Sequence, residues 1–438
     1  MGISIAFKDI SAALMEVAHK NGGESGAKPV VFHEPKSQGQ YASHTIENCS
    51  LFIVDFMLAV YSMWQPVDMR GRDLIAHIFT TLVHPALLRK QTLFLVFDNP
   101  KKVPPCKAAT QMKRRRTMMA VPEDLPISDD AILRSDDRYK LLATSKVRAR
   151  LMEYILHGLM RAIHDFTSGA EDQYGVVYAS TPWRAAPSFG DPRLTSGGFL
   201  ELTRTGAPCP RPTSQGEGDP ICRVLADKMA QFMEVEGPVV VDSKDLDMLG
   251  IFSASPPKNS VFLRISVRDG ASGGREFVFI DVDALWESVF RMSSARALHF
   301  TLALILAGSD FCEGVRGIAG LRILRTALGL RPAREPHKRS APARPDFFEP
   351  GQLMVQRDGP RLSIAMGNLM RILVNASTRR TVDQKQPNML KRAVWNLRYW
   401  LDLDTIPSPL ETRAWWKNDK GVFLPVLDKV GGIEKKKS

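Results

Sequence analysis

The chain has 438 residues, with 59 Lys and Arg against 47 Asp and Glu, so its formal net charge is +12. Apolar residues make up 44% and charged residues 24%, which is typical of a globular protein and excludes wholesale disorder. The five cysteines form no Cys-x-x-Cys pair, which excludes a thiolate zinc site and favours a reducing compartment. With no signal-peptide pattern and no apolar stretch approaching the roughly 20 residues of a membrane span, we expect a soluble intracellular protein.

Short apolar runs that end in a carboxylate alternate with helical stretches along the first half of the chain. A stretch rich in Gly, Pro and Ser at Asn21–Gln40, which we expect to be a loop, precedes the first run at Leu51–Asp55. Asp73–Val83 predicts a helix, and Thr92–Asp98 is the second run. Continuous apolar runs of this length predict buried strands of a parallel sheet. The predicted fold class is therefore α/β, with a mostly parallel central sheet flanked by helices.

Positive charge and a long amphipathic helix follow the second run. Lys101–Arg116 holds seven cations and no acid, and Lys140–Phe166 predicts a helix with cations near its start. Its apolar residues recur every four positions, which predicts a face turned to the core. That face comprises Val147, Leu151, Ile155, Leu159 and Ile163.

The second half repeats the alternation and then becomes basic. Ser180–Gln215, with six prolines, predicts a loop or insertion; Asp219 and Pro220 predict a helix start, with Asp219 at the N-cap. A third apolar run begins at Pro238, and Ala297–Ala307 predicts a helix. Residues 331–438 carry 21 Lys and Arg against 11 Asp and Glu. We expect five regions: 1–125 as an N-terminal unit, 126–215 as a helical region with a Gly/Pro-rich insertion, 216–330 as a second part of the same unit, 331–351 as a linker, and 352–438 as a basic helical region.

Seven carboxylates stand at the end of an apolar element or at a helix start: Asp55, Asp98, Glu217, Asp219, Asp245, Asp247 and Asp310. A single Asp after a strand is usually a turn former or a helix cap. Seven acids that converge at the carboxyl edge of a parallel sheet repel one another unless cations neutralise them. All-oxygen ligands select Mg²⁺ or Mn²⁺. The pattern predicts two Mg²⁺ ions, replaceable by Mn²⁺, that act on a phosphodiester held by the Lys101–Arg116 patch.

These acids stand in motifs that resemble the flap endonuclease/XPG superfamily of metal-dependent 5′ nucleases. The motifs occur in the family order: Met1-Gly-Ile, Val54-Asp55, Val96-Phe-Asp98, Gly216-Glu-Gly-Asp219, Asp245-Leu-Asp247 and Gly308-Ser-Asp-Phe-Cys-Glu-Gly-Val-Arg-Gly-Ile318. The resemblance covers residues 1–330 in outline. It implies a PIN-like 5′ nuclease fold with a helical arch, in which the seven acids bind metal. Asp219 stands where flap endonucleases have Glu.

The same resemblance implies residues that contact nucleic acid. A Lys and an Arg seven residues apart contact the scissile phosphate in the family; Lys107 and Arg114 have that spacing, two residues later than in flap endonucleases. The register of the Arg stays open because Lys113, Arg115 and Arg116 are adjacent. Gly2 corresponds to the family's N-terminal Gly. Gly317 and Arg322 fall on its helix-two-turn-helix motif, which here has Ala319 and lacks a Lys.

We therefore expect a structure-specific 5′ nuclease that acts on branched DNA in replication, recombination or repair. The alternatives are an RNA nuclease, either a 5′-to-3′ exoribonuclease or an endonuclease of messenger RNA, and a non-catalytic nucleic-acid-binding relative. Ile163-His-Asp165 and Trp395–Trp400 resemble the exoribonucleases, although a pair of Trp on a helix is more often core. We expect a monomer with a nucleic-acid partner and no sliding-clamp or membrane partner. The expected location is the nucleus or a site of DNA replication, with the cytoplasm as the alternative.

Overall fold

The structure is a computed structural model of the whole chain. It describes residues 5–22, 27–33, 41, 43–64, 68–97, 122–137, 140, 144–180, 199–203, 218–232, 237–243, 245–269, 275–309 and 320–330, with 355–358, 361–364, 393, 397 and 400 nearer the C-terminus.

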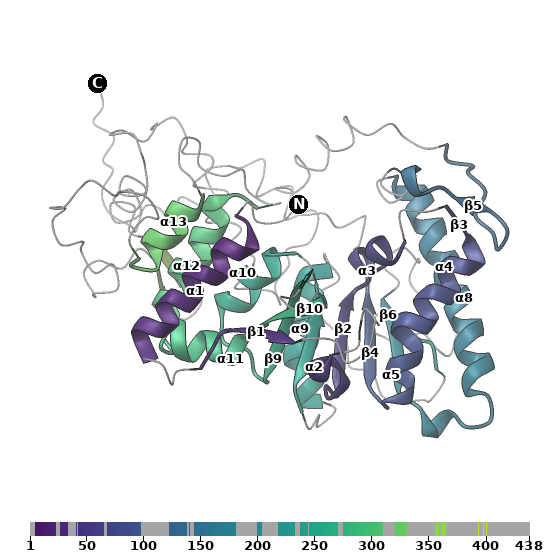
Figure 1. Cartoon of the computed structure of the whole chain (residues 1–438), viewed down its shortest axis with the longest axis horizontal. Helices are drawn as coiled ribbons and strands as arrows, with labels where there is room; N and C mark the ends of the chain where they lie inside the picture. The colour runs from purple at the N-terminus through teal and green to yellow at the C-terminus, as the bar shows by residue number, and fades with distance from the viewer. Residues whose placement is uncertain are drawn as a thin grey trace, which may run out of the picture.

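A single large sheet organises the described residues. It has eight strands in the order β1, β10, β9, β8, β2, β4, β6, β7 (Figure 1). Five neighbouring strands are parallel: β9 (Val261–Asp269), β8 (Val239–Asp242), β2 (Leu51–Asp55), β4 (Thr92–Val96) and β6 (Val176–Ser180). Antiparallel pairing adds β10 (Arg275–Asp281) and then β1 (Val30–His33) at one edge, and β7 (Phe199–Glu201) at the other. The predicted α/β class with a mostly parallel sheet is confirmed.

Helices cover both faces of this sheet and form two hydrophobic cores. The first core lies under α1 (Phe7–Gly22), α9 (Gly218–Phe232), α10 (Asp247–Ala254), α11 (Val282–Ala284) with the π-helical segment η5 (Leu285–Val289), α12 (Ser294–Ala307) and α13 (Gly320–Ala327). The second lies under α2 (His44–Glu47), α3 (Phe56–Met63), α4 (Gly71–Ile78) with the π-helical segment η2 (Phe79–Val83), α5 (His84–Leu88) and α8 (Ser145–Thr167). The fold is a three-layer α/β/α sandwich.

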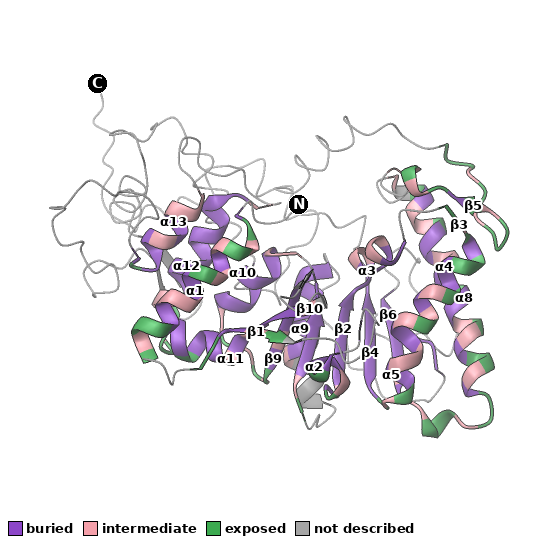
Figure 2. Cartoon of the chain, viewed as in Figure 1, coloured by how far each residue is buried: buried purple, intermediate pink, exposed green. Residues whose placement is uncertain are grey.

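The central strands are apolar along their whole length because side chains on both faces are buried. In β2, Leu51 and Ile53 enter the first core while Phe52 and Val54 enter the second. Figure 2 shows β2 and β4 as buried along their length, with exposed residues on the outer faces of the helices. This is why a continuous apolar run predicted each of these strands.

Helix α8 confirms the predicted amphipathic helix. Val147, Leu151, Ile155, Leu159 and Ile163 are all fully buried, and the helix packs along α4. Near its start, the Lys146 Nζ lies 2.7 Å from the Glu123 carboxylate, and Arg150 donates to the Glu123 carbonyl at 2.7 Å. The cations at the start of α8 are therefore partly engaged by the chain itself.

Several expectations about loops and ends were wrong in detail. The expected loop Asn21–Gln40 contains β1, and the expected insertion Ser180–Gln215 contains β7. Within 352–438, expected to be helical, the described residues include the hairpin β11 (Val355–Asp358) and β12 (Arg361–Ile364). Asn21–Gln40 and Ser180–Gln215 each contribute one short strand to an edge of the central sheet, where a few residues suffice to pair.

Smaller elements complete the described part of the chain. Strands β3 (Met69–Arg70) and β5 (Ile132–Leu133) pair with each other, and η3 (Ser135–Asp137) and η4 (Glu171–Gln173) are single 3₁₀ turns. No single described helix has both the length and the hydropathy of a membrane span; α12 reaches the threshold only together with Val282–Val289, across a bend of 111°.

Candidate functional site

Asp55 is the last residue of β2 and the first acid of the predicted site. It is 9% exposed, and its carboxylate caps α3 by accepting a hydrogen bond from the Leu58 N–H at 3.3 Å. Residues alternate faces along a strand, so Asp55 follows Leu51 and Ile53 on the face that holds the first core. Its Cα pairs with that of Val96, the last residue of β4. The cap fixes the carboxylate at the carboxyl edge of the sheet.

Asp245 and Asp247 lie at the same edge, in the connection from β8 to α10. The carboxylate of Asp245 accepts the Asp247 N–H at 3.0 Å, and the Asp245 N–H donates to the Ser243 Oγ at 3.3 Å. Asp247 is the first residue of α10 and is 1% exposed. Because Val54 of β2 pairs with Asp242 of β8, this connection leaves the sheet beside Asp55. One turn therefore presents two carboxylates next to the end of β2.

Asp219 reaches this edge from a helix. It lies in the first turn of α9 and is buried. Because α9 begins at Gly218, Asp219 lies inside the helix, and the expectation that it is the N-cap was wrong by two residues. Helix α9 packs on β2, β4 and β8. It ends at Phe232, a few residues before β8 begins at the amino edge of the sheet. The C-terminal end of α9 therefore lies near the amino edge, and Asp219 lies toward the carboxyl edge.

The structure thus brings four predicted ligands, Asp55, Asp219, Asp245 and Asp247, to one edge of the sheet. Within the described residues, no three His, Cys, Asp or Glu side chains are grouped closely enough to hold a metal ion together. The other predicted site residues lie outside the described part of the chain: Gly2, Asp98, Lys107, Lys113, Arg114, Arg115, Arg116, Glu217, Asp310 and Gly317.

Asp242 is a further buried acid beside these four, but it faces the other way. Its carboxylate lies 2.8 Å from the Arg264 Nε, and both side chains are buried on the side of the second core. The Arg264 guanidinium stacks over the rings of Tyr41 and Phe277, 4.5 Å and 5.1 Å from their centroids. Burial, together with the charge of Asp242, raises the pKa of Tyr41 above its ordinary value. Asp242 is thus paired with Arg264, on the face of the sheet opposite to the predicted ligand Asp55.

Arg322, predicted to contact nucleic acid, lies on α13 and is half-buried. A Cβ at Gly320 would lie 2.9 Å from the Ala307 Cβ, so α13 starts tightly against the end of α12. Arg325, one turn after Arg322, donates to Glu16 of α1 at 2.8 Å. Burial acts to raise the pKa of Glu16, but hydrogen bonds and charge from Lys20 and Arg325 outweigh it and hold that pKa below its ordinary value. Helix α13 is thus anchored on two sides.

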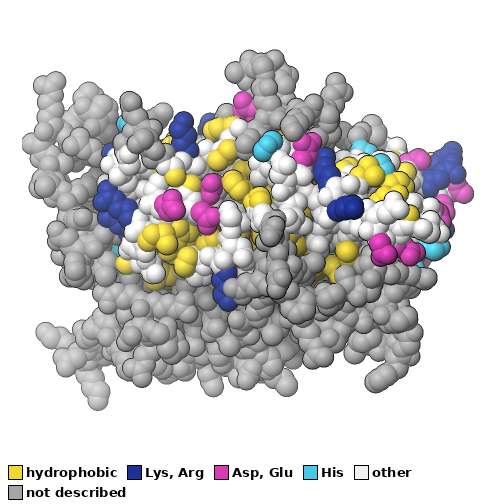
Figure 3. Space-filling model, turned by 90° about the horizontal axis from the view of Figure 1, so that it is seen from below, with side chains coloured by type: hydrophobic (Ala, Val, Ile, Leu, Met, Phe, Trp, Pro, Cys, Tyr) yellow, Lys and Arg dark blue, Asp and Glu magenta, His cyan; other side chains and the backbone are white. Residues whose placement is uncertain are grey.

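Charged side chains of both signs are scattered over the opposite side of the described molecule. Figure 3, seen from below, shows acidic and basic side chains interspersed with apolar ones among the described residues. In Figure 1, strands β2 and β4 run upward from α2 and α5 to α3, so this view looks onto the amino edge. The concentration of buried carboxylates belongs to the carboxyl edge.

Two buried arginines next to the acids were missed by sequence reasoning. Arg264 stands inside the apolar run of β9, and Arg223 stands between Cys222 and Val224 on the apolar face of α9. Both are at most 1% exposed. A cation within an otherwise apolar strand or helix face is the signal that could have identified them.

No protein-family model matches the chain, and no curated protein matches it. The sequence resemblance and the geometry of the carboxyl edge are therefore the grounds for a functional proposal.

Proposed function

We propose that this chain is a Mg²⁺-dependent 5′ nuclease of the flap endonuclease type that hydrolyses phosphodiester bonds of branched DNA. The observation that carries the proposal is the placement of four carboxylates from three separate segments at one edge of a parallel sheet. Ligands of open α/β sheets bind at this edge. The acids come from the end of β2, the start of α9 and the connection between β8 and α10.

The donor chemistry of this edge fits a hard divalent cation. Asp55, Asp219 and Asp247 are buried carboxylates, and the mutual repulsion of such groups is offset by a bound cation. Since no three described acids are grouped, a complete site needs at least one ligand from outside the described residues. Asp98, Glu217 and Asp310 are the candidates. Bound Mg²⁺ would supply a nucleophilic hydroxide and would neutralise charge on the leaving oxygen.

The chain's own part in the reaction is to hold its carboxylates in place. The Leu58 N–H fixes Asp55, and the Asp245 carboxylate fixes the backbone at Asp247. Fixed groups need no reorganisation at the moment of reaction, and their effect is larger at a buried site. Lys107 and Arg114 would stabilise the negative charge of the phosphate as electrostatic partners rather than as proton donors.

A matched pair of substitutions tests the proposal. Asp55 and Asp281 each end a strand and each cap the following helix, Asp55 through the Leu58 N–H and Asp281 through the Ala284 N–H at 2.9 Å. However, β10 is antiparallel to β9, so Asp281 lies at the amino edge. Asn keeps the capping oxygen in both variants. Asp55→Asn is expected to lower Mg²⁺-dependent cutting of a 5′-flap substrate by at least about 100-fold, and Asp281→Asn by no more than about twofold.

The same assay separates the alternative functions. The wild type is offered DNA flaps and matched 5′-monophosphate RNA in Mg²⁺ and in Mn²⁺, with binding followed at several salt concentrations. Preferential loss of the RNA would select an RNA nuclease. Salt-sensitive binding without hydrolysis of either polymer would select a non-catalytic nucleic-acid-binding protein. Equal cutting by wild type and Asp55→Asn would refute the assignment of Asp55 to the metal site.

A further inference from the structure

Arg223 is a fully buried cation on the helix that carries Asp219. It is 1% exposed and lies one helical turn after Asp219 on α9. Burying a guanidinium costs several kcal/mol unless its N–H groups are hydrogen-bonded and its charge is compensated. The partners of Arg223 therefore show what this arginine does.

Those partners are concentrated at the C-terminal end of α10. The Arg223 Nη1 donates to the carbonyls of Ile251, Phe252 and Ser255 at 3.4, 3.4 and 3.1 Å. The Nη2 donates to the Pro256 carbonyl at 3.0 Å and to the Ser255 Oγ at 3.4 Å. The last carbonyls of a helix lack partners within the helix and carry partial negative charge, so a cation there is favourable. Arg223 caps α10 from the neighbouring helix.

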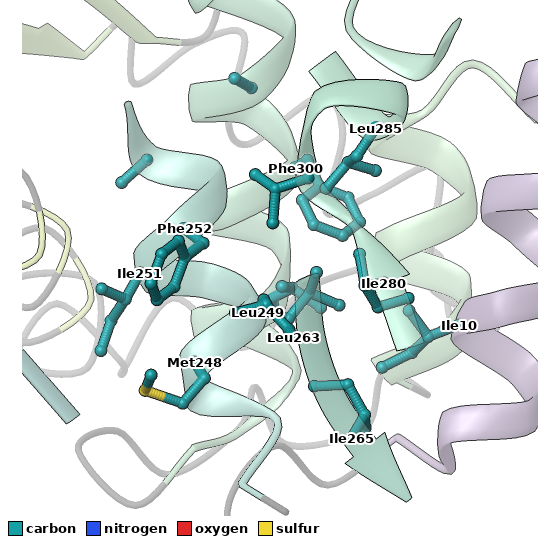
Figure 4. Packing of buried hydrophobic residues seen from close by; sticks show 14 of the residues in the cluster. Ile10, Met248, Leu249, Ile251, Phe252, Leu263, Ile265, Ile280, Leu285 and Phe300 are labelled. Carbon is teal, nitrogen blue, oxygen red and sulfur yellow. The ribbon is translucent and has the colours of Figure 1, made fainter. Parts of the chain in front are cut away.

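Two further contacts hold the guanidinium in this orientation. Its Nε donates to Asp227 at 2.8 Å, one turn later on α9, and its carbon lies 4.8 Å from the centroid of the Phe252 ring. Asp227 in turn accepts the Lys258 N–H at 3.2 Å, which ties the connection after α10 to α9. Figure 4 shows Phe252, with Met248, Leu249 and Ile251 of α10, among the buried hydrophobic residues of the first core.

The two helices joined by this contact each carry a carboxylate of the candidate metal site. Helix α10 has eight residues and is therefore about 12 Å long, with Asp247 at its first residue and the Arg223 contacts at its end. A short helix clamped at one end cannot tilt or slide along α9 without breaking these bonds. We propose that Arg223 is a positioning residue that fixes Asp219 relative to Asp247, an inference that rests on the proposed nuclease function.

The test compares variants of the full-length chain by three measurements. Arg223→Lys keeps the charge but loses the fork of donors, and Asp227→Asn weakens the same contact from the other side. Leu159→Ala in α8, buried in the second core, is the control for lost stability. Thermal unfolding gives the stability of each variant. Mn²⁺ binding and amide hydrogen exchange in 218–224 and 246–250 are then measured at a temperature at which every variant is folded.

Arg223→Lys is expected to weaken Mn²⁺ binding about 10–100-fold, as loss of a residue that supports metal ligands does, and to speed exchange in both segments. Asp227→Asn should do the same to a smaller extent, and Leu159→Ala should leave Mn²⁺ affinity within about twofold of wild type. If Arg223→Lys binds Mn²⁺ as tightly as wild type, or if Leu159→Ala loses as much Mn²⁺ affinity as Arg223→Lys, the positioning role of Arg223 is overturned. The proposed function is not affected by either result. A wild type that binds no Mn²⁺ overturns the proposed function, and the positioning role with it.

Discussion

His299 lies in the middle of α12 with no exposed surface. Burial lowers its pKa to about 4, because the charged imidazolium is disfavoured away from water. Between the ordinary His pKa of about 6.5 and pH 4, the unfolded chain binds a proton at this residue and the folded chain does not. The contribution of neutral His299 to the free energy of unfolding is therefore full above about pH 6.5 and falls as the pH drops toward 4.

We expect His299→Gln to remove this acid sensitivity. From pH 7 to pH 4, the free energy of unfolding of wild type should fall by about 3 kcal/mol more than that of His299→Gln, which corresponds to the difference between the two pKa values. Urea unfolding at several pH values measures the difference. His19→Gln, at the exposed end of α1, is the control and should follow wild type. Parallel pH curves for wild type and His299→Gln would contradict this reading of His299.

The sequence pattern predicts that Asp55 and Asp247 lie at one edge of the sheet, but it does not predict the residues that support them. Asp55 ends β2 and Asp247 follows β8, and parallel strands end at one edge, so the placement of both acids follows from the apolar runs. Arg223 and Arg264 could not be assigned in the same way, because a cation is ordinarily placed at the surface. Their partners are backbone carbonyls and a carboxylate whose positions exist only in the folded chain.

Gly175, just before β6, makes a close backbone contact with the end of α5 and with the start of β4. Its N–H donates to the Leu87 carbonyl at 2.9 Å, and a Cβ built there would lie 2.2 Å from the Gln91 carbonyl oxygen. A backbone oxygen that also accepts the Val176 N–H cannot give way without disturbing the start of both strands. Gly175 is therefore required by a close approach of two chain segments.

Gly175→Ala is expected to lower the free energy of unfolding by about 2 kcal/mol or more, within the range for overpacking of a well-packed site. Gly22→Ala is the matched control: at the end of α1, its Cβ would meet nothing within 4 Å. Ala also has the higher helix propensity, so this variant should be neutral or slightly more stable. Chemical denaturation of both variants measures the contrast, and equal stability of the two would refute the steric argument.

Elements with a uniform apolar pattern were the predictable ones. The buried strands β2 and β8 are apolar at every position before their final Asp, and α8 has apolar residues every four positions. These patterns can be recognised in the sequence without knowledge of the neighbouring strands. Strands β1 and β7 have four and three residues within stretches rich in Gly and Pro. Their strand conformation depends on pairing with β10 and β6, so it is a property of the sheet and not of the local sequence.

At the scale of the whole molecule, a residue far along the chain completes the first core. Trp400 is 1% exposed and belongs to this core with Ala393 and Leu397, which lie seven and three residues before it in the sequence. A Cβ at Gly250 of α10 would lie 2.2 Å from the Trp400 ring, so the indole rests directly on the α10 backbone. The expectation that a helical Trp here is core is confirmed for Trp400.

Trp400→Ala is expected to destabilise the entire protein by about 3–5 kcal/mol, as removal of a large buried aromatic side chain does. The loss should appear in one cooperative transition monitored at both the sheet and α10, because Trp400 shares the first core with them. Met292→Ala removes a large side chain that is 64% exposed and should change little. A Trp400→Ala protein as stable as wild type would mean that the core forms without this side chain.

Because β1 pairs with β10, the two partners of this strand pair leave the ribosome far apart in time. Val30 pairs with Ile280, 250 residues later in the chain, and α1 packs against η5, which follows β10. At translation rates of about 5–20 residues per second, the N-terminal segments wait on the order of 10 to 50 seconds before their partners are made. During that interval the apolar side of α1, including Ile10 and Leu14, has no completed core to enter. The first core also contains residues of α12 and α13 and Trp400, so on the ribosome it is completed only after those residues have been made.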